Sequence, residues 1–187
     1  MNQEVELQIH GSMFFFLKKF IENNYDIDTW LKINKSAGAL HSTYEMHKNY
    51  PASEMDSIIN TATNYTGLSK NDLQEKLGEY LVPDLLNIFK SHLNPAWKTF
   101  GLLENTELVM HKAVRKQANQ ANPPILNISR VHDKLLIIDY YSKRRMANLA
   151  VGIIKGIARF YNESDIVDVI LNANPDDERV QIRVEFK

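Results

Sequence analysis

The spacing of apolar residues changes along this chain, and the change limits the folds that the chain can adopt. Up to about residue 120, apolar side chains recur every three to four residues, as in a helix with one buried face. After Pro124 they alternate in two runs, then return to helical spacing once, and two further strands follow. These segments are residues 125–131, 135–141, 145–161, 166–171 and 180–186. The first two are joined by the short turn His132-Asp133 and therefore predict a hairpin.

This order of elements predicts an α+β fold. We expect a helical N-terminal part and a four-stranded, mostly antiparallel sheet with flanking helices. The 187 residues suffice for one core or for two tightly joined subdomains, and no Gly/Ser/Pro-rich linker separates a second module. We therefore expect a single domain over residues 1–187, with a helical subdomain at 1–68 and a second subdomain at 69–187.

The N-terminal half is expected to consist of helices joined by turns. Ser12 is a plausible N-cap for the first helix, and the polar segment 39–51 reads as a loop. Gly78 marks close packing or a bend. Pro83 fits best in the first turn of a new helix, because its missing N–H costs nothing there. The other predicted helices lie at residues 12–23, 26–34 and 55–65, with one more beginning near Ser69.

A further predicted helix carries a histidine in its apolar face. His111 lies three residues after Leu108 and three before Val114, so the periodicity turns it toward the core. A buried imidazole needs a partner, since leaving it unpaired costs about 1–3 kcal/mol. A metal ion would serve, but a carbonyl or carboxylate partner is the commoner case. The apolar positions of this helix are Leu103, Leu108, Met110, Ala113, Val114 and Ala118.

The end of the predicted hairpin places three polar side chains two residues apart. If the run is extended, Tyr140, Ser142 and Arg144 point to the same side. A guanidinium matches a carboxylate with two parallel charge-assisted bonds, so the cluster suits an anionic ligand. Two alternatives remain. The three could form the polar face of a half-solvated strand, and the helix that begins nearby could turn Arg144 off that face.

Composition excludes several functions. The net charge of −1 and the pI near 6.6 give no electrostatic case for nucleic acid, and no basic cluster points to a membrane surface. The chain has no cysteine, which removes disulfides, thiolate metal sites, cysteine nucleophiles and haem-thiolate chemistry. His41 and His47 lack an acidic partner in a motif, so we expect no metal site there. The N-terminus resembles neither a signal peptide nor a membrane helix, and we expect a cytoplasmic protein.

The spacing between these features resembles that of a known family. Pro124 lies thirteen positions after His111 and sixteen before Tyr140, which begins the Tyr-x-Ser-x-Arg run. This pattern is similar to the haem nitric oxide/oxygen binding (H-NOX) family, which is related to the sensor domain of soluble guanylate cyclase. The resemblance extends from Ile9-His10-Gly11 to the C-terminal strands. The residues Glu104–Glu107 differ from the aromatic and acidic residues often found just before the family's histidine.

The resemblance implies a fold that encloses haem b, and it implies a role for each matching residue. His111 would be the proximal ligand of the haem iron, and Pro124 would pack against the porphyrin. The motif Tyr140, Ser142 and Arg144 would bind the haem propionates. An apolar distal pocket would be lined by Met13, Leu17, Leu81, Leu85 and Leu149.

The resemblance also implies a sensor rather than an enzyme. Nitric oxide, and also carbon monoxide, would bind the ferrous iron, and weakening of the bond from His111 would free its helix to move. Oxygen should bind weakly or not at all, because Leu149 occupies the position that holds a tyrosine in oxygen-binding members. A separate histidine kinase or cyclic-di-nucleotide enzyme would receive the signal. A haem peroxidase or oxygenase would need a distal acid/base group or a thiolate, and neither is evident. The alternative is a haem-free or haem-storing interaction module of the same fold.

Overall fold

A computed structural model describes residues 6–111 and 123–187, which form two compact units. The described part of the first unit is residues 6–73, and that of the second is residues 74–111 with 123–187. No helix in the described ranges is both long and apolar enough to span a bilayer.

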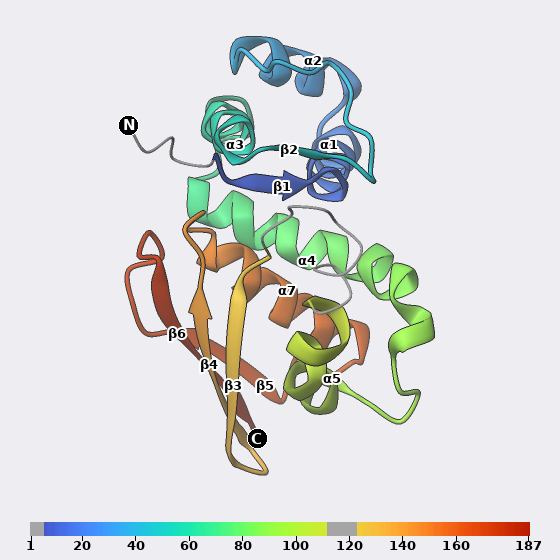
Figure 1. The fold of residues 1–187 in the computed structure, drawn as a ribbon, viewed down its shortest axis with the longest axis vertical. Helices are drawn as coiled ribbons and strands as arrows, with labels where there is room; N and C mark the ends of the chain where they lie inside the picture. The colour runs from blue at the N-terminus through green and yellow to red at the C-terminus, as the bar shows by residue number, and fades with distance from the viewer. Residues whose placement is uncertain (1–5, 112–122) are drawn as a thin grey trace. The chain divides into compact units, whose positions relative to one another are not determined.

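The first unit combines three helices with a short strand pair (Figure 1). The strands are antiparallel, with Ile9 opposite Tyr50, and both of these side chains are buried. The loop predicted at residues 39–51 is therefore wrong at its C-terminal end, where burial of Tyr50 outweighs the polar sequence around it. The elements are β1 (Gln8–His10), α1 (Gly11–Asn24), α2 (Ile27–Ser36), β2 (Asn49–Pro51) and α3 (Ala52–Thr66).

The predicted cap of the first helix is also wrong. His10 stands at the N-cap of α1, and Ser12 lies inside the helix with Oγ 2.8 Å from Nδ1 of His10. The helix begins earlier because β1 leads directly into it through Gly11. A Cβ at Gly11 would lie 2.0 Å from the carbonyl oxygen of Glu45, so only glycine fits this close approach.

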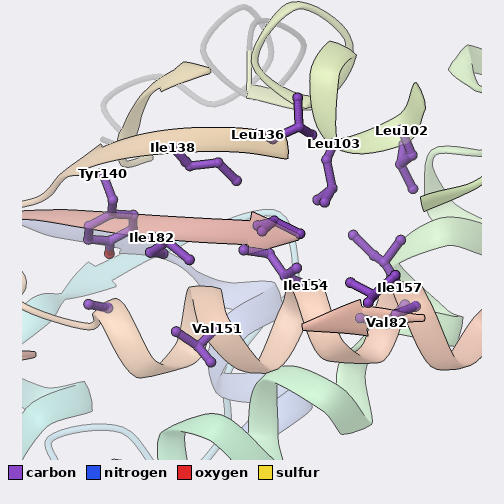
Figure 2. Close-up of a cluster of buried hydrophobic side chains, with 14 of the residues drawn as sticks. Val82, Leu102, Leu103, Leu136, Ile138, Tyr140, Val151, Ile154, Ile157 and Ile182 are labelled. Carbon is purple, nitrogen blue, oxygen red and sulfur yellow. The ribbon is translucent and has the colours of Figure 1, made fainter. Parts of the chain in front are cut away.

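The second unit is built on an antiparallel sheet in the order β3-β4-β6-β5 (Figure 1). This confirms the α+β class and the four-stranded, mostly antiparallel sheet, including the predicted hairpin. Val151, Ile154 and Ile157 of α7 pack against Ile138 and Ile182 of the sheet (Figure 2). The bounds are β3 (Ile125–His132), β4 (Leu135–Tyr141), α7 (Ala147–Phe160), β5 (Val167–Leu171) and β6 (Arg179–Phe186).

The helix α4 (Lys70–Ile88) runs through Pro83, so the prediction of a new helix at this proline was wrong. An internal proline costs about 3 kcal/mol, but Leu86, beyond Pro83, is buried in the second unit's core. Burial of this later segment offsets the cost and keeps the helix continuous.

Close packing at Gly78, which was one of two readings of the sequence, is confirmed. A Cβ added to Gly78 would lie 2.4 Å from the carbonyl oxygen of Leu149 in α7. A Cβ added to Gly152 would lie 2.0 Å from the carbonyl oxygen of Glu75 in α4. The backbones of α4 and α7 therefore meet in direct contact at these glycines.

The segment before His111 changes helix type. A 3-10 turn (η1, Lys90–His92) is followed by α5 (Thr99–Thr106) and then by a π-helical turn (η2, Glu107–His111). Leu108 is 61% exposed, so its assignment to the apolar face was wrong. A π turn holds more residues than an α turn and displaces Leu108 from the face that buries Leu103 and Met110. The predicted core positions Ala113, Val114 and Ala118 lie outside the described residues.

Candidate cofactor-binding site

Tyr140, Ser142 and Arg144 lie close together in the second unit, although β4 ends at Tyr141. The buried Tyr140 hydroxyl lies near the Ser142 side chain and the backbone of Met146; burial raises its pKa, and these two groups oppose that effect. The backbone N–H of Arg144 donates to Oγ of Ser142 at 3.2 Å. The Arg144–Ser142 bond lies in the turn between β4 and α7, so the three residues lie close together although the strand does not continue through them.

Arg144 is a largely enclosed cation that has no ion-pair partner among the described carboxylates. Burial lowers the pKa of its guanidinium, and the nearby Tyr140 opposes that effect. No carboxylate in the described ranges forms an ion pair with Arg144, whereas its exposed neighbour Arg145 lies 3.5 Å from Glu178. Enclosing an unpaired charge is costly unless an anion compensates it. The surroundings of Arg144 are therefore suited to a bound anion.

His111 ends the π turn and is mostly enclosed, with its side chain 18% exposed. Burial and the positive charge of Arg144 lower the pKa of His111 from 6.5 to about 4, and a hydrogen bond with the backbone carbonyl of Pro124 opposes them less strongly. The imidazole is therefore neutral near pH 7, and this is the form that binds a metal ion. The structure thus brings together His111, Pro124 and Arg144, although His111 and Arg144 are more than thirty positions apart in the sequence.

Glu107 is a site residue that the sequence reasoning missed. Its Oε2 lies 2.8 Å from Nδ1 of His111 and accepts the backbone N–H of Leu126 at 3.3 Å. The signal was present in the sequence, because a carboxylate four residues before a helical histidine lies on the same face. From the sequence, residues 104–107 stood out only as a departure from the family pattern.

The residues expected to line the distal pocket are all apolar; three lie in the second unit and two in the first. In the second unit Leu81 is fully buried, Leu85 packs against the core, and the carbonyl of Leu149 lies beside Gly78. In the first unit Leu17 is fully buried in α1 and Met13 is partly buried.

The two histidines of the first unit that were considered as metal ligands, His41 and His47, each lie near a carboxylate. Nδ1 of His41 lies 2.9 Å from Glu54, and Nε2 of His47 lies 3.4 Å from Glu45. Across the described ranges, no three His, Asp or Glu side chains are grouped so as to hold a metal ion by themselves.

The residues of the second unit fit haem. A neutral histidine can serve as the single protein ligand of an iron whose other bonds come from a porphyrin. A phenol, a hydroxyl and a guanidinium can bind the carboxylates of the porphyrin, and the guanidinium supplies the positive charge that those carboxylates require.

A family model described as Haem-NO-binding (HNOB) matches residues 10–168, which is most of the chain. The chain belongs to this family. HNOB, or H-NOX, domains bind haem and act as gas sensors. No curated protein sequence matches this H-NOX chain.

Solved H-NOX structures share the fold. The unliganded Fe(II) H-NOX protein from K. algicida has a TM-score of 0.85 at 21% identity, covering 96% of this chain and 97% of that one. An H-NOX protein from S. oneidensis in the Fe(II)NO state gives 0.83 at 17% identity, covering 96% and 99%. A single-residue mutant of T. tengcongensis H-NOX gives 0.80 at 19% identity, covering 96% and 98%.

Proposed function

We propose that this protein is a haem-based nitric oxide sensor and that the whole chain, residues 1–187, is one H-NOX domain with the subdomains 1–68 and 69–187. The observation that carries the proposal is the convergence of a neutral imidazole, at His111, with a guanidinium that has no carboxylate partner in the described ranges, at Arg144. One group supplies a ligand for a metal and the other a site for an anion, and haem b joins both functions in one molecule.

Each residue of the site has a distinct role in this proposal. The His111 imidazole, neutral at pH 7, coordinates the iron. Arg144 neutralises a propionate, while Tyr140 and Ser142 donate hydrogen bonds to the same groups and fix the turn. Pro124, whose carbonyl lies near the His111 ring, packs against the porphyrin. Bound ferrous haem would supply the iron that takes up a diatomic gas.

The residues of the proposed distal pocket determine which gas is favoured. Oxygen needs a hydrogen-bond donor near the iron, whereas nitric oxide and carbon monoxide bind without one. The side chains of Leu17, Leu81, Leu85 and Leu149 have no polar atom, and Met13 offers only a thioether. We therefore propose that the protein binds nitric oxide and carbon monoxide, and that it binds oxygen weakly or not at all.

A sensor without catalytic activity produces a signal only through another protein, so the proposal requires an effector. By analogy with the family, we propose a separate histidine kinase or cyclic-di-nucleotide enzyme as the effector, and no catalytic role for this chain. Affinity capture with haem-free, ferrous and nitric-oxide-bound protein tests this step. Equal effector affinity in all three states would contradict switching, because a ligand shifts an equilibrium only through differential affinity.

The gas selectivity is tested by absorption spectroscopy of the ferrous protein. Under anaerobic conditions, nitric oxide should shift the Soret band at once. In air, the same protein should give no stable oxygen complex. A stable oxygen complex would contradict the proposed apolar pocket, and a protein that takes up no haem would instead support the haem-free interaction module.

A further inference from the structure

We propose that Glu107 is a positioning residue for the iron ligand, fixing the tautomer and orientation of His111 and increasing its strength as a donor. This inference deepens the proposed function and rests on it. The residues on which it depends all lie in the second unit.

The contact has the geometry of a charge-assisted hydrogen bond. Oε2 of Glu107 lies 2.8 Å from Nδ1 of His111, one helical turn along the chain. An ionised carboxylate can only accept, so the bond places the ring proton on Nδ1 and leaves the lone pair of Nε2 free for a metal. The Pro124 carbonyl is the other acceptor near the ring, but a neutral imidazole has only one N–H, and the charged carboxylate is the stronger acceptor for it.

The same carboxylate is anchored from a second element. The backbone N–H of Leu126, at the start of β3, donates to Oε2 of Glu107 at 3.3 Å. One oxygen therefore joins the π turn, the imidazole and the sheet. An anchored acceptor resists rotation of the ring better than a freely moving carboxylate at a helix surface, which pays side-chain entropy to stay in place.

The chemical consequence follows from the charge on the acceptor. A carboxylate that accepts the Nδ1 proton makes the imidazole more basic at Nε2 and strengthens its bond to a metal. Replacing the carboxylate with an amide of the same shape removes the charge and retains the packing. Glu104, one turn earlier, offers a matched control, since its carboxylate lies 3.8 Å from Arg130 rather than beside His111.

The first test is resonance Raman spectroscopy of the ferrous haem protein. Glu107→Gln should lower the iron–histidine stretching frequency and accelerate haem loss by about 10- to 100-fold, the usual effect of removing such a partner. Glu104→Gln should leave both unchanged. An iron–histidine frequency in Glu107→Gln equal to that of the wild type would overturn the inference.

A second test uses protein that lacks the His111 side chain and takes its ligand from solution. In His111→Gly protein supplied with haem, free imidazole should bind about 10-fold more tightly than 1-methylimidazole, which has no N–H for Glu107. In the double variant His111→Gly, Glu107→Gln, which keeps the same shape, this preference should disappear. A preference of equal size in both proteins would contradict the role of Glu107.

The two proposals fail differently. Wild-type protein that takes up no haem overturns the proposed function and this inference with it. Wild-type protein that binds haem through His111, together with an unaltered Glu107→Gln spectrum, overturns only the role of Glu107.

Discussion

Replacing Arg144 with alanine should change haem affinity and haem-free stability in different ways. In the haem-bound protein the guanidinium would lose charge-assisted bonds worth about 1.5–3 kcal/mol each. At about 1.4 kcal/mol for each factor of ten, loss of one such bond predicts haem dissociation about 10- to 150-fold faster. In the haem-free protein, Arg144 is an enclosed cation that no described carboxylate pairs with, so its removal should be neutral or stabilising.

Two measurements separate these effects. Haem transfer to an excess of a haem-scavenging protein gives the dissociation rate, and urea unfolding of haem-free protein gives the stability. Lys143→Ala changes an exposed lysine beside Arg144 and should alter neither quantity. Ser142→Ala loses a neutral bond worth about 1 kcal/mol and should release haem about fivefold faster. Equal dissociation rates for Arg144→Ala and Lys143→Ala would contradict a propionate site at Arg144, as would a haem-free Arg144→Ala protein that is clearly less stable than the wild type.

Two further predictions concern the scaffold and are read out by urea unfolding. Glu54 is buried and accepts bonds from Tyr44 at 2.7 Å and from His41 Nδ1 at 2.9 Å. Burial raises the pKa of Glu54, but these bonds outweigh it and leave the pKa below 4.5. Stability from Glu54 is therefore present above pH 4.5 and lost as pH falls through the lowered pKa. Glu54→Gln should cost about 1–3 kcal/mol near pH 7 and lose less stability in acid, and an acid-dependence equal to that of the wild type would contradict this. Gly152→Ala should destabilise the protein by about 1–3 kcal/mol, because its Cβ meets the Glu75 backbone. Gly101→Ala, which meets only the Trp97 side chain, should cost less, and equal costs would contradict close packing of α4 and α7.

The spacing of apolar residues predicted those elements in which buried side chains recur at one constant period along most of the element. Burial alternates over residues 125–129 of β3 and 136–141 of β4, and the helix after them carries Val151, Ile154 and Ile157 on one face, so these elements were predicted from sequence. The pairing of β4 with β6 was not predicted strand by strand, because it joins segments about forty to fifty residues apart.

The elements that were missed depend on contacts that a local pattern does not contain. Pro83 lies inside α4 because burial of Leu86 offsets the cost of the proline. Leu108 is exposed because a π turn shifts the helical register, and the spacing of apolar residues assumed an α-helix throughout. The strand β2 forms because it finds β1 some forty residues away.

In the candidate site, too, some features follow from the local sequence and others depend on the fold. Residue types and spacing indicated His111 and the Tyr140, Ser142, Arg144 motif. The arrangement that makes these residues suited to haem required the structure, since it depends on the lowered pKa of His111 and on the absence of a described carboxylate beside Arg144. Glu107 could have been found from its position four residues before His111, and only its contact with Leu126 needed the fold.

The central claim, that His111 is the protein ligand of a haem in this chain, is tested most directly by an absorption titration of haem into ferrous wild-type and His111→Gly protein. We expect saturable binding of one haem per wild-type chain, with a spectrum typical of histidine ligation. We also expect that His111→Gly retains haem only when imidazole is added. Unchanged haem content and an unchanged spectrum in His111→Gly would contradict the claim.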